Sequence, residues 1–141
     1  MNWIAFAMLA ATSFGFYNFF TKLSADKLSP TIALMCIAGT SFLVATISTV
    51  VFKISGQELT FSKEALWLPI LAGISTGVAE IFYLYMFTKD APLNLGAPMV
   101  IGVTMLIAVL LGVIFLKEPL SVSKIAGICL IIAGAILLIR S

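Results

Sequence analysis

Five long apolar runs, separated by short polar segments, organise this chain. The runs cover about residues 3–23, 31–53, 66–87, 95–116 and 122–140. A helix rises about 1.5 Å per residue, so roughly 20 apolar residues cross the roughly 30 Å hydrocarbon core of a bilayer. The pattern therefore predicts five membrane-spanning helices.

The polar segments between the runs leave little room outside the membrane. The longest of them covers residues 55–64, and proline punctuates three others, at Pro30, Pro92 and Pro119. Pro98 falls near the start of the fourth run, where a missing N–H costs little. Because irregular backbone is not tolerated facing lipid, we expect a helical bundle that forms a single transmembrane domain over residues 1–141.

The composition supports an integral membrane protein, since 62% of the residues are hydrophobic and only 10% are charged. The net charge of +2 and the lack of a basic cluster argue against a nucleic-acid partner. The sequence has no His, and its two cysteines, Cys36 and Cys129, lie in apolar runs, where we expect buried small apolar side chains. We predict neither a metal site nor a cofactor.

The Lys and Arg residues are balanced between the two sides that five spans define. One side carries Lys53, Lys63, Lys117 and Lys124, and the other carries Lys22, Lys27, Lys89 and Arg140. The positive-inside rule infers membrane orientation from an excess of Lys and Arg in the short loops of one side. Here the two sides carry equal numbers, so the rule indicates no orientation. Either a small sample balances by chance, or the chain inserts in both orientations and pairs with an inverted copy of itself.

Glu80 is the one acid inside an apolar run. An acid near the middle of a span costs roughly 2.5–3.5 kcal/mol on insertion scales, so its environment must compensate. Helical spacing places Gly73, Gly77 and Tyr83 on or near its face. Two interpretations stay open: an acid that lines a cavity and binds a cation, a proton or a polar substrate group, or a structural acid that accepts a hydrogen bond from a neighbouring helix.

Two further polar side chains are candidates for binding substrate or ion. Asn18 lies in the first run, near one face with Gly15 and Lys22, and either lines a substrate path or cross-links two helices. Lys22 is close enough to the end of its run to reach the interface. Tyr83 offers a hydroxyl to a carboxylate or to a substrate.

Glycines mark two candidate surfaces for helix packing, because small residues allow helices to approach closely. Gly73 and Gly77 form a small-xxx-small pair in the third run, and Gly127 and Gly134 lie seven residues apart on one face of the fifth. The second face is a candidate for contact with a second copy of the chain.

Catalysis finds no support in the sequence. It contains no nucleophile–base pair, no set of metal ligands and no glycine-rich phosphate loop. We therefore do not expect an enzyme.

The segment Gly112 to Ile139, GVIFLKEPLSVSKIAGICLIIAGAILLI, resembles the end of an EamA-type repeat of the drug/metabolite transporter superfamily. That signature has a span ending in an acid and a proline, then a polar turn, then a helix of the form G-x-x-L-I-x-x-G. Its positions are occupied here by Gly112, Glu118, Pro119, Gly127, Leu130, Ile131 and Gly134. Residues 11–22 and 91–98 are similar to other parts of the repeat, so the resemblance covers essentially the whole sequence.

The resemblance implies a secondary transporter, an exporter of small metabolites or drug-like solutes, with its site between two inverted five-helix units. The common family member carries two such repeats, whereas this sequence contains one. It would therefore act by alternating access as an antiparallel dimer of ten helices, formed with a second copy or with a homologous half-size chain. Short loops and the lack of targeting signals favour a prokaryotic inner membrane.

Two other functions fit the same sequence features. One is a non-transporting membrane subunit of a larger complex, and the other is half of a heteromeric translocator of lipid or lipid-linked sugar. The related four-helix small multidrug exporters use an acid in the first helix. The first run has no acid here, so their mechanism does not transfer to a matching residue.

Overall fold

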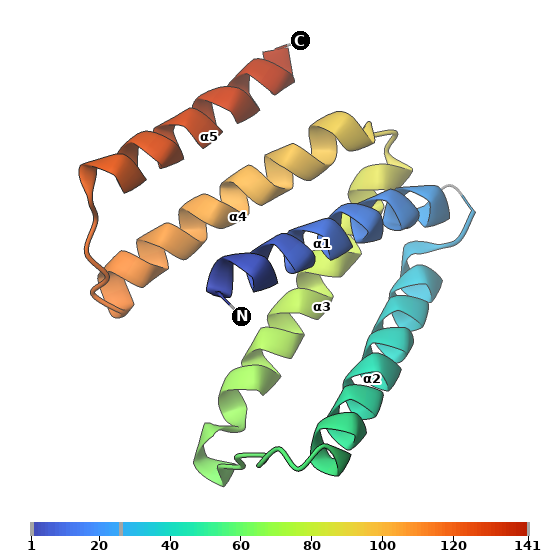
Figure 1. Ribbon diagram of the computed structural model, residues 1–141. Coiled ribbons are helices and arrows are strands. Elements are labelled where there is room, and N and C mark those ends of the chain that lie inside the picture. Colours follow the sequence, from blue (N-terminus) through green and yellow to red (C-terminus); the bar gives the residue numbers. More distant parts are fainter. Residues whose placement is uncertain (1, 26, 141) are drawn as a thin grey trace. The chain divides into compact units, whose positions relative to one another are not determined.

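A computed structural model describes residues 2–25 and 27–140, and side chains as far as residue 137. Its helices are α1 (Trp3–Ala25), α2 (Pro30–Ile54), α3 (Trp67–Thr88), α4 (Leu93–Phe115) and α5 (Val122–Arg140), with a 3₁₀ turn, η1 (Lys63–Ala65), before α3 (Figure 1). The described residues contain no strand. The predicted all-α fold with five helices is confirmed, and each helix lies within two residues of its apolar run.

The helices differ in their capacity to span a bilayer. The first four meet the requirement by length and composition, the third with η1 included. In α5 the apolar stretch with described side chains, Val122–Leu137, is shorter. That α5 also crosses the membrane therefore stays a prediction.

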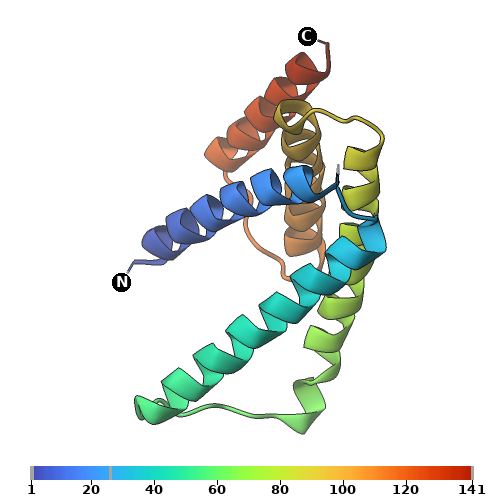
Figure 2. The ribbon, with the colours of Figure 1, turned by 90° about the vertical axis from the view of Figure 1, so that its right-hand side faces the viewer.

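The backbone contacts divide the chain into two compact units, Met1–Asp90 and Ala91–Ser141. In the first unit α3 packs against both α1 and α2, and α1 also contacts α2. In the second unit α4 and α5 lie side by side and run in opposite directions, as both ribbon views show (Figures 1 and 2). A single domain over the whole chain stays a prediction.

Most large apolar side chains lie on the surface of the described chain. The few that are fully buried include Leu84 and Phe87, whereas Phe42 and Phe82 are 71% and 70% exposed. Water would penalise such a surface at roughly 25 cal/mol per Å², but lipid tails do not. The prediction that Cys36 and Cys129 are buried is wrong, because both are exposed.

Hydroxyl groups within the spans bond to their own helices. Side-chain bonds to the carbonyl four residues earlier are made by Thr12, Ser13, Thr40, Thr46, Ser48, Thr49, Ser75, Thr76 and Thr104. A backbone carbonyl has a second lone pair, so the helix accepts this bond without losing its own. The hydroxyls are thereby satisfied without a neighbouring helix.

Two helices end in left-handed residues that are not glycine. Asp90 follows α3 with φ 60°, and Lys117 follows α4 with φ 54°. After α4, the N–H groups of Leu116 and Glu118 both donate to the carbonyl of Gly112, at 3.1 and 3.2 Å. A proline comes two residues after each left-handed residue, as is common beyond a helix terminus.

Pro98 lies inside α4 and not in its first turn, contrary to the prediction. The helix begins at Leu93, and the N–H groups of Leu95 and Gly96 already bond to the carbonyl of Pro92. Proline at position 98 therefore leaves the carbonyl of Asn94 without its usual helical donor. The start of α4 has a weakened hydrogen-bond ladder.

Candidate functional site

The acid of the third span is held by a phenol of the first. The Tyr17 hydroxyl on α1 donates a hydrogen bond to Oε2 of Glu80 on α3, and both side chains are half-buried. A phenol and a carboxylate placed in hydrocarbon both need polar partners, and here each supplies one to the other. A hydrogen bond to a charged acceptor is also stronger than one between neutral groups.

A second hydrogen bond joins the same two helices. The Tyr83 hydroxyl on α3 donates to Oδ1 of Asn18 on α1 at 2.9 Å. Tyr83 therefore does not donate to Glu80, its neighbour on α3, in this state. Asn18 joins the two helices, and whether it also contacts substrate stays a prediction.

Lys22 lies further along the α1–α3 interface. Its ammonium is 3.4 Å from the carbonyl oxygen of Phe87, to which it donates, and 5.5 Å from the centroid of the Phe87 ring. Phe87 is in the last turn of α3, where the helix dipole favours a cation. The Phe87 ring also contacts that of Tyr83 edge-on, with centroids 4.9 Å apart.

These three contacts follow one another in the same order on both helices, so α1 and α3 run in the same direction where they cross. Along α3 they lead from Glu80 through Tyr83 to Phe87, a rise of roughly 10 Å at 1.5 Å per residue. We call the set Tyr17, Asn18, Lys22, Glu80 and Tyr83 the α1–α3 polar line. It extends from the interior of the spans towards one membrane surface.

The chemistry at the deep end of the polar line suits a cationic ligand or a proton. Glu80 provides the carboxylate, and the Tyr17 ring has the Phe14 ring 6.3 Å away in an edge-on arrangement. Aromatic faces attract cations, most strongly where water is excluded. No group of three or more His, Cys, Asp or Glu side chains in the described part of the chain is placed to hold a metal ion.

The structure brings together the three residues that the sequence suggested for binding, Asn18, Glu80 and Tyr83. Their roles towards a substrate or ion stay predictions. Sequence reasoning missed Tyr17, the hydrogen-bond donor to Glu80. The signal was present, since a phenol inside an apolar run needs a partner just as the acid does.

The four glycines expected to pack helices face open space. A Cβ added at Gly73, Gly77, Gly127 or Gly134 would meet no described atom within 4 Å. A close approach occurs instead at Gly102 on α4, where an added Cβ would lie 3.5 Å from Cβ of Ala135 on α5. Helix packing at these four glycines stays a prediction, and for Gly127 and Gly134 the expected partner is a second copy of the chain.

The model of the EamA-like transporter family matches residues 1–140. The chain belongs to the EamA-like transporter family. Among the curated proteins and the solved structures that were searched, none matches it significantly. The EamA match covers a single repeat of five helices, and it agrees with the polar turn and glycine-containing helix at the end of the sequence.

Membership of the EamA-like family fixes the broad class of the protein. It is a multi-pass membrane protein in contact with lipid and a member of the drug/metabolite transporter superfamily. The EamA-like family is a family of transporters and not of enzymes. The α1–α3 polar line is therefore a candidate transport site.

Proposed function

We propose that this protein is a secondary transporter that exports small metabolites or drug-like solutes by alternating access between two inverted five-helix units. The observation that carries the proposal is the Tyr17–Glu80 hydrogen bond, which keeps an acid inside the spans of an EamA-like protein. An acid at this depth is costly, and in transporters such residues mark substrate or proton paths.

The Tyr17–Glu80 bond links ligand exchange to helix movement. A cation or a proton that reaches the Glu80 carboxylate competes with the Tyr17 hydroxyl for it. A hydrogen bond to a charged group contributes about 1.5–3 kcal/mol. Loss of the Tyr17–Glu80 bond is therefore offset only if the ligand replaces the Tyr17 hydroxyl as the partner of the carboxylate. Because Tyr17 and Glu80 are on different helices, the occupied and empty states favour different α1–α3 separations.

An antiparallel partner would complete the transporter. The balanced Lys and Arg residues fit insertion in both orientations, and an inverted pair of repeats places its site near the membrane midplane. The open faces at Gly127 and Gly134 fit close contact with the second unit. The partner is a second copy or a homologous half-size chain, in a prokaryotic inner membrane.

A vesicle assay tests the transport function. Purified protein in liposomes with an outward or inward proton gradient is offered tetraphenylphosphonium, uridine or phenylalanine, which represent cations, nucleosides and amino acids. We expect gradient-dependent movement of one of them, and its loss in Glu80→Gln. The control Glu64→Gln changes an exposed acid of η1 and should transport normally. If Glu80→Gln keeps both transport and its pH dependence, Glu80 is structural and the mechanism is wrong.

Labelling of a single cysteine tests the antiparallel pair. Cys36 and Cys129 are replaced by Ala, and Ser141→Cys is labelled from each side of intact cells. Comparable labelling from both sides is expected for an antiparallel homodimer. Labelling from one side alone would contradict the homodimer and direct attention to a partner chain or to a subunit role.

A further inference from the structure

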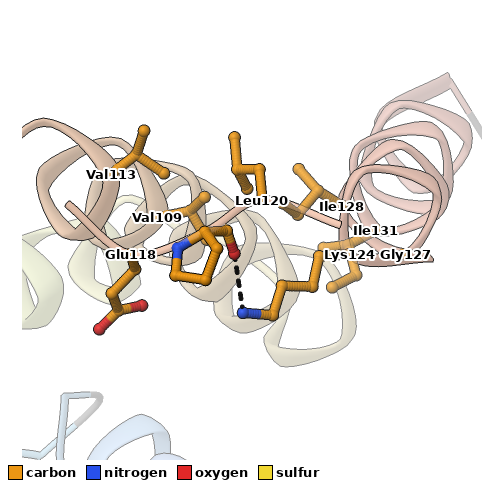
Figure 3. Close-up of a pocket in the computed structure, with 9 residues that line it drawn as sticks. Val109, Val113, Glu118, Leu120, Lys124, Gly127, Ile128 and Ile131 are labelled. Carbon is orange, nitrogen blue, oxygen red and sulfur yellow. Dashed lines mark hydrogen bonds between the residues drawn. The ribbon is translucent and has the colours of Figure 1, made fainter. Parts of the chain in front are cut away.

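A pocket of about 390 Å³ lies in the second unit, where α4 turns into α5 (Figure 3). None of its lining residues belongs to the α1–α3 polar line. It is lined by Val109, Val113, Glu118, Pro119, Leu120, Lys124, Gly127, Ile128 and Ile131. The proposed contact with a second unit involves one of its lining residues, Gly127, but assigns no role to the charged turn.

The lining of the pocket changes from charged to apolar along the helices. Glu118 and Lys124 lie at the turn, and Figure 3 shows their charged ends projecting from the same side of it. The other lining includes Val109 of α4 and Ile131 of α5, further along their helices. Val109 is six residues before the end of α4, which places it roughly 9 Å deeper at 1.5 Å per residue.

The two charges at the turn are held apart. The Lys124 ammonium donates to the carbonyl oxygen of Pro119 at 3.1 Å, and no ion pair joins it to Glu118 within the described residues. The Glu118 carboxylate folds back towards α4, with Oε2 3.4 Å from the position of a Cβ on Gly112. The carboxylate and the ammonium therefore lie at separate places on the turn that borders the pocket.

Both charges stand where a helix dipole disfavours them. Glu118 follows the C-terminal end of α4, which carries partial negative charge, and Lys124 is in the first turn of α5, where the partial charge is positive. The arrangement instead strengthens a negative pole on α4 and a positive pole on α5, which suits a ligand with two opposite charges.

We propose that this pocket binds one zwitterionic phospholipid with a primary ammonium headgroup, of the phosphatidylethanolamine type. The ammonium lies at Glu118, the phosphate lies at Lys124, and an acyl chain follows the Val and Ile side chains into the bilayer. A primary ammonium donates hydrogen bonds to the carboxylate, whereas a quaternary ammonium has no N–H to donate. The order of charge and apolar surface along the pocket matches the order along such a lipid.

Native mass spectrometry of the full chain tests the proposal. The detergent-purified protein is titrated with phosphatidylethanolamine, phosphatidylcholine and phosphatidylglycerol of the same acyl chains. We expect phosphatidylethanolamine to bind about tenfold more tightly than either of the others. Glu118→Gln should remove its advantage over phosphatidylcholine, and Lys124→Gln should weaken binding of both about tenfold. The matched controls Lys63→Gln and Glu64→Gln, in η1, should bind like the wild type.

Val109→Phe provides a test that leaves both charges intact. The added ring fills the deep end of the pocket and should weaken phosphatidylethanolamine at least fivefold, even if a charge variant does not fold. Equal affinity for the three lipids would overturn the proposal, as would a preference for phosphatidylglycerol that Glu118→Gln leaves unchanged. Displacement of the lipid by equimolar phosphoethanolamine would show a site for soluble zwitterions, and would also overturn it.

Discussion

The Tyr17 hydroxyl donates to the Glu80 carboxylate, so a phenol of the first span and an acid of the third form one unit inside the membrane. Without Tyr17, the Glu80 carboxylate would lose a charge-assisted hydrogen bond inside the span.

Removing the donor should impair transport while leaving the acid in place. We expect Tyr17→Phe to lower the transport rate roughly tenfold, because a hydrogen bond to a charged group contributes about 1.5–3 kcal/mol and orients the carboxylate. Initial rates in liposomes over a range of substrate concentrations measure the effect. Tyr85→Phe alters an α3 tyrosine that is 48% exposed and serves as the control. An unchanged rate in Tyr17→Phe would show that the bond has no part in transport.

The Asn18–Tyr83 hydrogen bond should make a small, separate contribution to stability. A double-mutant cycle with Asn18→Leu and Tyr83→Phe is expected to give a coupling energy of about 0.6 kcal/mol, the average for polar contacts between membrane helices. Unfolding in mixed micelles with increasing SDS measures it. A coupling energy within error of zero would mean that the 2.9 Å contact contributes nothing to the fold.

Glycine at the end of α4 should stabilise the protein. Lys117 has φ 54°, a conformation that costs an L-residue roughly 1–2 kcal/mol and costs glycine little. We expect Lys117→Gly to raise the free energy of unfolding of the purified protein by about 1 kcal/mol. Asp90→Gly at φ 60° should gain less, because Asp tolerates this region better. A loss of stability in Lys117→Gly would show that the Lys117 side chain makes a compensating contact.

Restoring the broken ladder of α4 should stabilise the helix and slow transport. Pro98→Ala returns an N–H to the carbonyl of Asn94, and we expect a higher unfolding temperature with a lower maximal rate. Such prolines leave a helix free to bend. Pro92→Ala is the matched control, because Pro92 precedes the helix and breaks no helical bond. Equal transport rates in Pro98→Ala and the wild type would contradict a hinge at this point.

The sequence was sufficient to predict the helices, because polar residues and prolines bound each apolar run. The start of α4 moved by two residues since Pro92, and not the later run of apolar residues, sets it. Because of this shift, Pro98 lies inside the helix, where it removes a helical hydrogen bond, and not in the first turn, where a missing N–H costs little. The apolar pattern predicts that a helix forms more reliably than it predicts the residue at which the helix begins.

The partners across the α1–α3 polar line could not be read from one sequence. Helical spacing relates Glu80 to Tyr83 on the same helix, yet each accepts or donates across to α1. The pairing depends on how far α1 slides along α3, which no residue pattern within either helix specifies. For the same reason the sequence singled out Asn18, Glu80 and Tyr83 as polar side chains within the apolar runs, while Tyr17 was overlooked.

Ser and Thr hydroxyls within the spans, such as those of Thr12, Thr46 and Thr104, donate to carbonyls of their own helices. These spans therefore enter the bilayer with few hydroxyl groups that lack a hydrogen-bond partner. A newly inserted chain is then not compelled to find a neighbour at once. If two chains form the transporter, as proposed, single chains diffuse laterally as a reservoir from which pairs form by mass action. The fraction of working transporters would accordingly rise with the number of chains per area of membrane.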